Sequence, residues 1–84
     1  METVKKIIKK GIEIESGIIF QILSEVSGNG DIMIIKSDGL RDSLTYSVIV
    51  SSHQNKFLPI RFDSEDIKDA IFKVLNEYGN FIND

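Results

Sequence analysis

Residues 57–79 read FLPIRFDSEDIKDAIFKVLNEYG, in which a short apolar segment precedes acidic residues, an amphipathic repeat and a glycine. In the second half of this stretch, apolar residues recur at intervals of three and four, which is the period of one face of an α-helix. The stripe consists of Ile67, Ala70, Ile71, Val74, Leu75 and Tyr78. The pattern therefore predicts a C-terminal amphipathic helix that packs this stripe against the rest of the domain.

Both ends of this helix carry residues that are typical of caps. Asp63 or Ser64 can accept a hydrogen bond from a free backbone N–H of the first turn. Gly79 can adopt the positive φ that commonly ends a helix. Phe72 lies to one side of the apolar stripe, so we expect it either to wrap over the edge of the core or to form part of a partner interface.

Three segments before this helix have the composition and alternation of β-strands. Residues 44–52, LTYSVIVSS, alternate in side-chain character, and residues 32–36 form a short apolar run. Residues 57–62 are expected to form an edge strand or to contain a bulge, because Pro59 has no N–H to donate to a neighbouring strand. Segments rich in glycine, asparagine and serine are expected to form turns at residues 27–31, 37–39 and 53–56.

Residues 1–26 admit two interpretations. As one long helix they place their apolar residues on one broad face, although two glycines interrupt it. Alternatively, a short helix ends at Gly11 and a strand covers residues 18–26. Asn29 and Gly30 favour the second interpretation, because Asn-Gly is typical of a tight hairpin that needs a strand on its N-terminal side. We expect the strand, but the sequence leaves the choice open.

These elements together predict an α+β fold. A chain of 84 residues is too short for a second domain, so residues 1–84 are expected to form one small domain. We expect an antiparallel β-meander of three to five strands, with the C-terminal amphipathic helix packed on one face and a short N-terminal helix.

The composition argues against catalysis and against metal or cofactor binding. The chain contains no cysteine and a single histidine, His53, so the common zinc-ligand sets are absent. His53 lies in a polar turn without an orienting carboxylate nearby in sequence, and residues 38–42 and 63–66 lack the spacing of a calcium loop. We therefore expect neither an enzyme nor a cofactor, a bound metal or a small-molecule substrate.

The chain also lacks the sequence features of secreted and membrane proteins. It has no cysteine for disulfides, no apolar run of membrane-spanning length and no recognisable signal peptide. We therefore expect a cytoplasmic protein without a membrane span.

Four lysines near the N-terminus, Lys5, Lys6, Lys9 and Lys10, are candidate contacts for an anion or a nucleic acid. On a helix they form two pairs at i,i+4 spacing and give it a basic flank that could contact phosphates. The chain as a whole carries a net charge of −3, which weakens this interpretation. A nucleic-acid-binding accessory protein is therefore the alternative function.

The leading hypothesis is a non-catalytic protein–protein interaction or regulatory module that is homo-oligomeric. Ile34 and Ile35 are adjacent and so point to opposite faces of a strand, which predicts that another subunit covers one sheet face. A free sheet edge could also pair with a second copy or with another protein. Phe72 is the candidate residue for a partner interface on the C-terminal helix.

Overall fold

Residues 1–39 and 45–82 are described by a computed structural model, in which they form three helices and three strands. The elements follow in the order α1 (Glu2–Lys10), α2 (Ser16–Gly28), β1 (Asp31–Asp38), β2 (Thr45–Ser52), β3 (Ile60–Ser64) and α3 (Ile67–Tyr78). The predicted strand at residues 44–52 is confirmed from Thr45 onward, while Leu44 lies outside the described residues.

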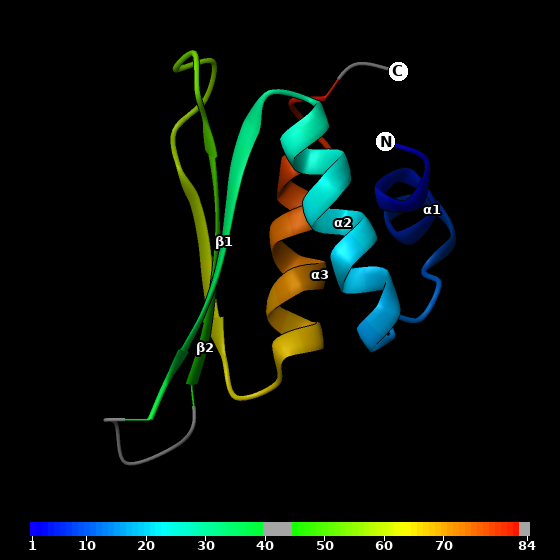
Figure 1. Ribbon diagram of the computed structural model, residues 1–84, viewed down its shortest axis with the longest axis vertical. Coiled ribbons are helices and arrows are strands. Elements are labelled where there is room, and N and C mark those ends of the chain that lie inside the picture. The colour runs from blue at the N-terminus through cyan, green and yellow to red at the C-terminus, as the bar shows by residue number, and fades with distance from the viewer. Residues whose placement is uncertain (40–44, 83–84) are drawn as a thin grey trace.

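The strands form one antiparallel sheet in the order β1-β2-β3, and the three helices lie on one face of it (Figure 1). α3 packs against β2 and β3, α2 packs against β1, and α1 packs across α2 and α3. The predicted α+β fold, with a meander and a C-terminal helix on one sheet face, is confirmed for the described part of the chain.

Alternation along β2 builds the centre of the core. Val48 and Val50 point toward the helices and are fully buried, and their register partners on β3, Phe62 and Ile60, share this face. The stripe predicted for α3 supplies the opposite side of the core. Its buried members are Ala70, Ile71, Val74, Leu75 and Tyr78.

The prediction of a strand at residues 18–26 is wrong. α1 does end at Gly11, whose backbone is left-handed with φ 63°, but residues 16–28 form α2. Ile22 and Val26 are one helical turn apart and both fully buried, so tertiary packing stabilises the helix. Gly30, with φ 85°, follows the end of α2 and leads into β1 instead of forming a hairpin.

The ends of α3 differ from the predicted caps. Asp66, rather than Asp63 or Ser64, caps the helix, because its carboxylate accepts a 3.0 Å hydrogen bond from the backbone N–H two residues ahead. Gly79 has φ −56° and does not adopt a positive φ. Its missing side chain instead lets α1 approach, since a Cβ at Gly79 would lie 3.0 Å from Cδ1 of Ile8.

Glu25 of α2 caps the N-terminus of α1. Its carboxylate accepts hydrogen bonds from the backbone N–H groups of Thr3, at 3.0 Å, and Val4, at 2.9 Å. Such first-turn groups have no partner within their own helix, so Glu25 satisfies them and ties the two helices together. Burial alone would raise the carboxyl pKa of Glu25, but the hydrogen bonds from Val4 and Thr3 outweigh it and lower the pKa below its usual value.

The start of β1 is fixed to the end of α3. The hydroxyl of Tyr78 donates a 2.6 Å hydrogen bond to Oδ2 of Asp31, and Nδ2 of Asn29 donates to both groups at 3.1 Å. Burial raises the pKa of the Tyr78 hydroxyl well above its usual range, and the neighbouring Asp31 adds to the shift. The hydroxyl therefore stays protonated at neutral pH and remains a donor to β1.

Candidate interaction surfaces

β1 is an edge strand along its whole length. β2 pairs with one side of it in a continuous register, from Asp31 opposite Ser52 to Asp38 opposite Thr45. Within residues 1–39 and 45–82, no strand pairs with its other side. β1 has eight residues and contains neither proline nor glycine, so its free backbone groups are suited to pair with another strand. We define the β1 edge surface as this free edge together with Ile32, Met33, Ile34 and Ile35.

The outer face of the β1 edge surface, away from the helices, is apolar. Ile32 and Ile34 point to this face, and they are 46% and 49% exposed. Ile34 lies opposite Ile49 of β2, which is half-buried, so apolar side chains continue from one strand to the next. Single exposed isoleucines are ordinary on a protein surface, but a contiguous group beside a free strand edge is typical of an interaction site.

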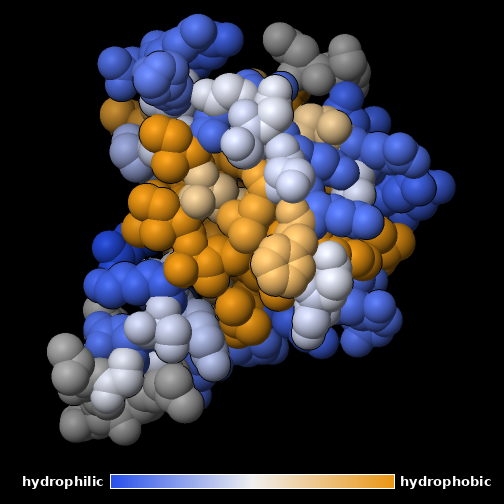
Figure 2. Space-filling model, in the orientation of Figure 1, coloured by the Kyte–Doolittle hydropathy of each residue, from blue (hydrophilic) through white to orange (hydrophobic). Residues whose placement is uncertain are grey.

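The inner face of the same edge is only partly covered. Met33 and Ile35 point toward the helices but remain half-buried, whereas their partners Val50 and Val48 on β2 are fully buried. Figure 2 shows hydrophobic side chains gathered across the middle of this side of the molecule, over β1 and α2. Apolar surface therefore flanks the free backbone edge on both faces of the sheet.

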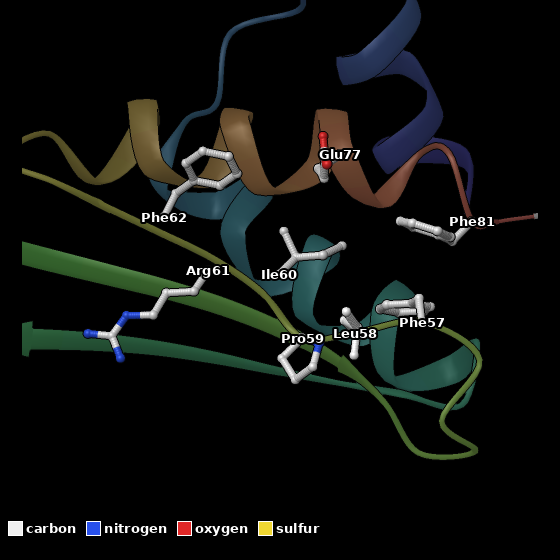
Figure 3. Close-up of a pocket in the computed structure, with 8 residues that line it drawn as sticks. All are labelled: Phe57, Leu58, Pro59, Ile60, Arg61, Phe62, Glu77 and Phe81. Atoms are coloured by element: carbon white, nitrogen blue, oxygen red, sulfur yellow. The ribbon is translucent and has the colours of Figure 1, made fainter.

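The outer face of β3 is charged instead. Nε of Arg61 lies 3.2 Å from Oδ1 of Asp63, and Nη2 of Arg61 lies 3.4 Å from Oγ of Ser47 on β2. Arg61 points away from α3, whereas Ile60 and Phe62 point toward it (Figure 3). The outer face of the sheet is thus apolar at β1 and polar at β3.

A groove of about 510 Å³ lies beside β3 (Figure 3). It is lined by Phe57, Leu58, Pro59, Ile60, Arg61, Phe62, Glu77 and Phe81, and we call it the β3 groove. Phe57 stacks on Phe81 with ring centroids 4.9 Å apart, which fixes one wall, and Leu58 is 87% exposed. The groove can accept apolar side chains of a partner, although only Arg61 and Glu77 offer charged groups to orient them.

The four candidate lysines lie together on α1, whose opposite side is buried. Lys6 forms a 3.2 Å ion pair with the exposed Glu2 of the preceding turn. Lys9 and Lys10 lie in the last turn, where positive charge stabilises the C-terminal end of a helix. Lys5 lines a small hollow between α1 and the residues that follow α3. Lys6, Lys9 and Lys10 therefore help to stabilise α1, and contact of the four lysines with an anion or a nucleic acid stays a prediction.

The other residues singled out from the sequence lie outside both surfaces. Phe72 projects from α3 outside the buried stripe and is 40% exposed, and His53 is exposed in the turn after β2. In residues 1–39 and 45–82, no three histidine, cysteine, aspartate or glutamate side chains gather in a group that could hold a metal ion. The described helices are also too short or too polar to cross a membrane.

No protein-family model, curated protein or solved structure matches this chain. The candidate surfaces are therefore identified from geometry alone. Sequence reasoning could not locate the β1 edge surface or the β3 groove, because both depend on strand order and on the contact between Phe57 and Phe81. The one signal in the sequence was the apolar run at Ile34 and Ile35, which predicts apolar side chains on both faces of a strand.

Proposed function

We propose that this protein is a non-catalytic interaction module that docks protein partners, including copies of itself, through the β1 edge surface. The observation that supports this is an eight-residue free edge strand with partly exposed apolar side chains on both faces. Such an edge offers a partner strand backbone hydrogen bonds, and the flanking side chains supply specificity.

Burial of apolar surface favours this association. Ile32 and Ile34 keep nearly half of their surface in water, and covering them contributes about 25 cal/mol for each Å² removed from water. Natural proteins usually protect free edges with proline or charge, because an open apolar edge promotes aggregation. β1 carries charge only at its ends, with Asp31 before the apolar run and Lys36 and Asp38 after it, so four consecutive apolar residues at its centre are left without such protection. This supports a docking role for the edge.

A pull-down of the tagged protein from a lysate of its native host, with and without nuclease, tests the proposal. We expect the wild-type protein to retain a protein partner after nuclease treatment and the Ile34→Lys variant to lose it. Leu58→Lys introduces the same side chain at an exposed apolar position of the β3 groove, so it shows whether capture depends on that groove instead of β1. Equal capture by the wild type and Ile34→Lys would contradict docking through β1.

The same experiment distinguishes this proposal from the alternative function. That alternative is a nucleic-acid-binding accessory protein that uses Lys5, Lys6, Lys9 and Lys10. In that case nuclease would abolish the capture, and the affinity would fall steeply as salt is added. Replacement of the four lysines by glutamate would then abolish binding, whereas Ile34→Lys would leave it unchanged.

A further inference from the structure

The side chains of β1 also indicate which partner fits this edge. We propose that a second copy of the chain occupies the β1 edge surface, with the two β1 strands antiparallel and related by a twofold axis through Ile34. This inference rests on the proposed function and names its partner. The two copies form one sheet of six strands, since each contributes three.

Symmetry restricts how two copies of β1 can pair. Two identical strands that lie side by side and antiparallel are related by a twofold axis perpendicular to the sheet, which keeps the helices of both copies on one face. Side chains that point outward therefore lie opposite side chains that point outward. Successive residues alternate between faces, so some residue must lie directly opposite the same residue of the partner. The axis then lies midway between these two copies, and we name it by that residue.

An axis through Ile34 places apolar residues opposite apolar residues on both faces. On the outer face Ile34 lies opposite the partner's Ile34, and on the inner face Met33 lies opposite the partner's Ile35. Ile32 lies opposite the partner's Lys36, whose aliphatic stem can cover the isoleucine while its ammonium group stays in water. Directly opposite pairs are the main side-chain contacts between antiparallel strands, so this register stabilises the seam.

Axes through neighbouring residues give poorer pairs. An axis through Lys36 sets two ammonium groups directly opposite each other. An axis through Met33 sets Asp31 opposite the partner's Ile35, and an axis through Ile35 sets Met33 opposite the partner's Ser37. Like charges across a strand pair repel, and an apolar residue opposite a polar one loses contact area. The axis through Ile34 is therefore preferred.

The same axis continues the hydrophobic core across the seam. Cross-strand neighbours within each copy are known from the register of the sheet. One row on the inner face then contains Phe62, Val48 and Ile35, followed by the partner's Met33, the partner's Val50 and the partner's Ile60. This row joins the two buried cores and covers Met33 and Ile35, which a single copy leaves half-buried.

α2 borders the seam with apolar side chains. Gln21 and Glu25 on one side of α2 contact Thr3 of α1, so Ile19 and Leu23 lie on the side turned away from α1. Both are half-buried, and α2 packs against β1. The hydrophobic area over β1 and α2 in Figure 2 is therefore the surface that the twofold axis brings against its own copy.

Sedimentation equilibrium of the purified protein tests whether the dimer forms. We expect the wild type and the Leu58→Lys control to dimerise, and the dissociation constant of Ile34→Lys to rise at least about tenfold, because two lysines then face each other at the axis. Circular dichroism should be the same for all three proteins, because Ile34 and Leu58 lie outside the buried core. A wild-type protein that stays monomeric at millimolar concentration would overturn the inference.

Cysteine cross-linking tests the register, since the chain has no cysteine of its own. Opposite Cα atoms of an antiparallel pair lie about 4.5–5.5 Å apart, within the range that a disulfide spans. We expect Ile34→Cys to form a covalent dimer on oxidation. Ile32→Cys and Lys36→Cys should each stay unlinked alone and should link to one another when mixed.

The outcomes distinguish this inference from the proposed function. Equal cross-linking at residues 32, 34 and 36 would indicate non-specific association and would overturn the register. A monomer whose capture of a lysate protein is abolished by Ile34→Lys would overturn the second-copy inference while supporting the interaction module. A dimer that Ile34→Cys links selectively supports the inference, whatever the lysate contains.

Discussion

β1 and β3 are the two edge strands of one sheet, and they differ in length and in side-chain chemistry. β1 has eight residues, with four consecutive apolar residues from Ile32 to Ile35. β3 has five residues, follows Pro59 and carries Arg61 and Asp63 on its outer face. Short length, proline and charge at an edge all discourage pairing with another strand. β3 therefore has more of this protection than β1, whose charged residues lie only on either side of its apolar run.

This difference between the two edges bears on whether association stops at a dimer. A sheet with two open edges can add copies at both sides and grow without limit. A sheet with one open edge stops at a pair, because the protected edge of each copy then lies on the outside. The contrast between β1 and β3 is thus the feature that separates a closed dimer from an aggregate.

Tyr78 supports both edges, so its removal should have the largest effect. Its hydroxyl holds Asp31 at the start of β1, and its ring centroid lies 5.9 Å from that of Phe57 beside the β3 groove. Tyr78→Ala removes a fully buried aromatic side chain and should lower the free energy of unfolding by about 3–5 kcal/mol. Urea denaturation measures this change, and a loss below about 1 kcal/mol would contradict the shared role of Tyr78.

Tyr78→Phe should affect β1 selectively. The aromatic contact with Phe57 remains, but Asp31 and Asn29 lose their shared partner, which should cost about 1–2 kcal/mol of unfolding free energy. Amide hydrogen exchange should become faster at the first residues of β1 and stay unchanged around Phe57. Equal acceleration at both edges would show that the hydroxyl does not act on β1 alone.

Glu25→Gln should destabilise the fold without affecting either edge. The loss of a charged cap on α1 should lower the unfolding free energy by about 1 kcal/mol at neutral pH. Since folding lowers the pKa of Glu25, its stabilisation is complete above the ordinary value of 4.5 and is lost as pH falls through the folded-state pKa.

Thermal unfolding across pH should therefore show the wild type and Glu25→Gln converging in acid. The dimer dissociation constant should be the same for both proteins when they are folded. A stability difference that stayed constant from neutral to strongly acidic pH would rule out the carboxylate as its source.

Arg61→Ile should have the smallest effect on stability and the clearest effect on assembly. Arg61 is exposed, so the unfolding free energy should change by no more than about 0.5 kcal/mol. The outer face of β3 loses its positive charge and comes to resemble that of β1. Sedimentation velocity should then detect species larger than a dimer, while the control Arg61→Lys stays dimeric. If Arg61→Ile also stays dimeric, the positive charge of Arg61 is not needed to protect β3, and the short strand, Pro59 and Asp63 are sufficient.

The parts of the fold with a strong local pattern could be predicted from the sequence. The stripe of α3 keeps helical spacing through Tyr78, residues 44–52 alternate as strands do, and residues 32–36 form a short apolar run that is typical of a strand. α2 was harder to predict, because isoleucine suits both helices and strands and the Asn-Gly pair after it is typical of a hairpin. Ile22 and Val26 are fully buried and α2 packs against β1, which stabilises the helix over the strand. The contact between α2 and β1 joins elements of different secondary structure, so a local pattern does not show it.

The candidate surfaces were predictable only in outline. The adjacent Ile34 and Ile35 predict a strand with apolar side chains on both faces, but not that this strand is an edge. The position of Phe72 outside the apolar stripe left both a core-edge role and an exposed role open; it is 40% exposed and belongs to neither surface that the structure defines, and its role in a partner interface stays a prediction. The β3 groove depends on Phe57 meeting Phe81, which lie on either side of α3 in the sequence, so no local pattern could reveal it.

The position of the β3 groove, on the edge opposite β1, would determine the valency of the proposed dimer. Two copies joined at β1 carry the groove twice, once at each far end of the combined sheet, and both grooves are unobstructed by the joining. A target with two apolar segments at a matching distance would meet the second groove at a high effective concentration once the first is filled. A groove too weak to retain a ligand alone can then contribute to tight binding by the pair.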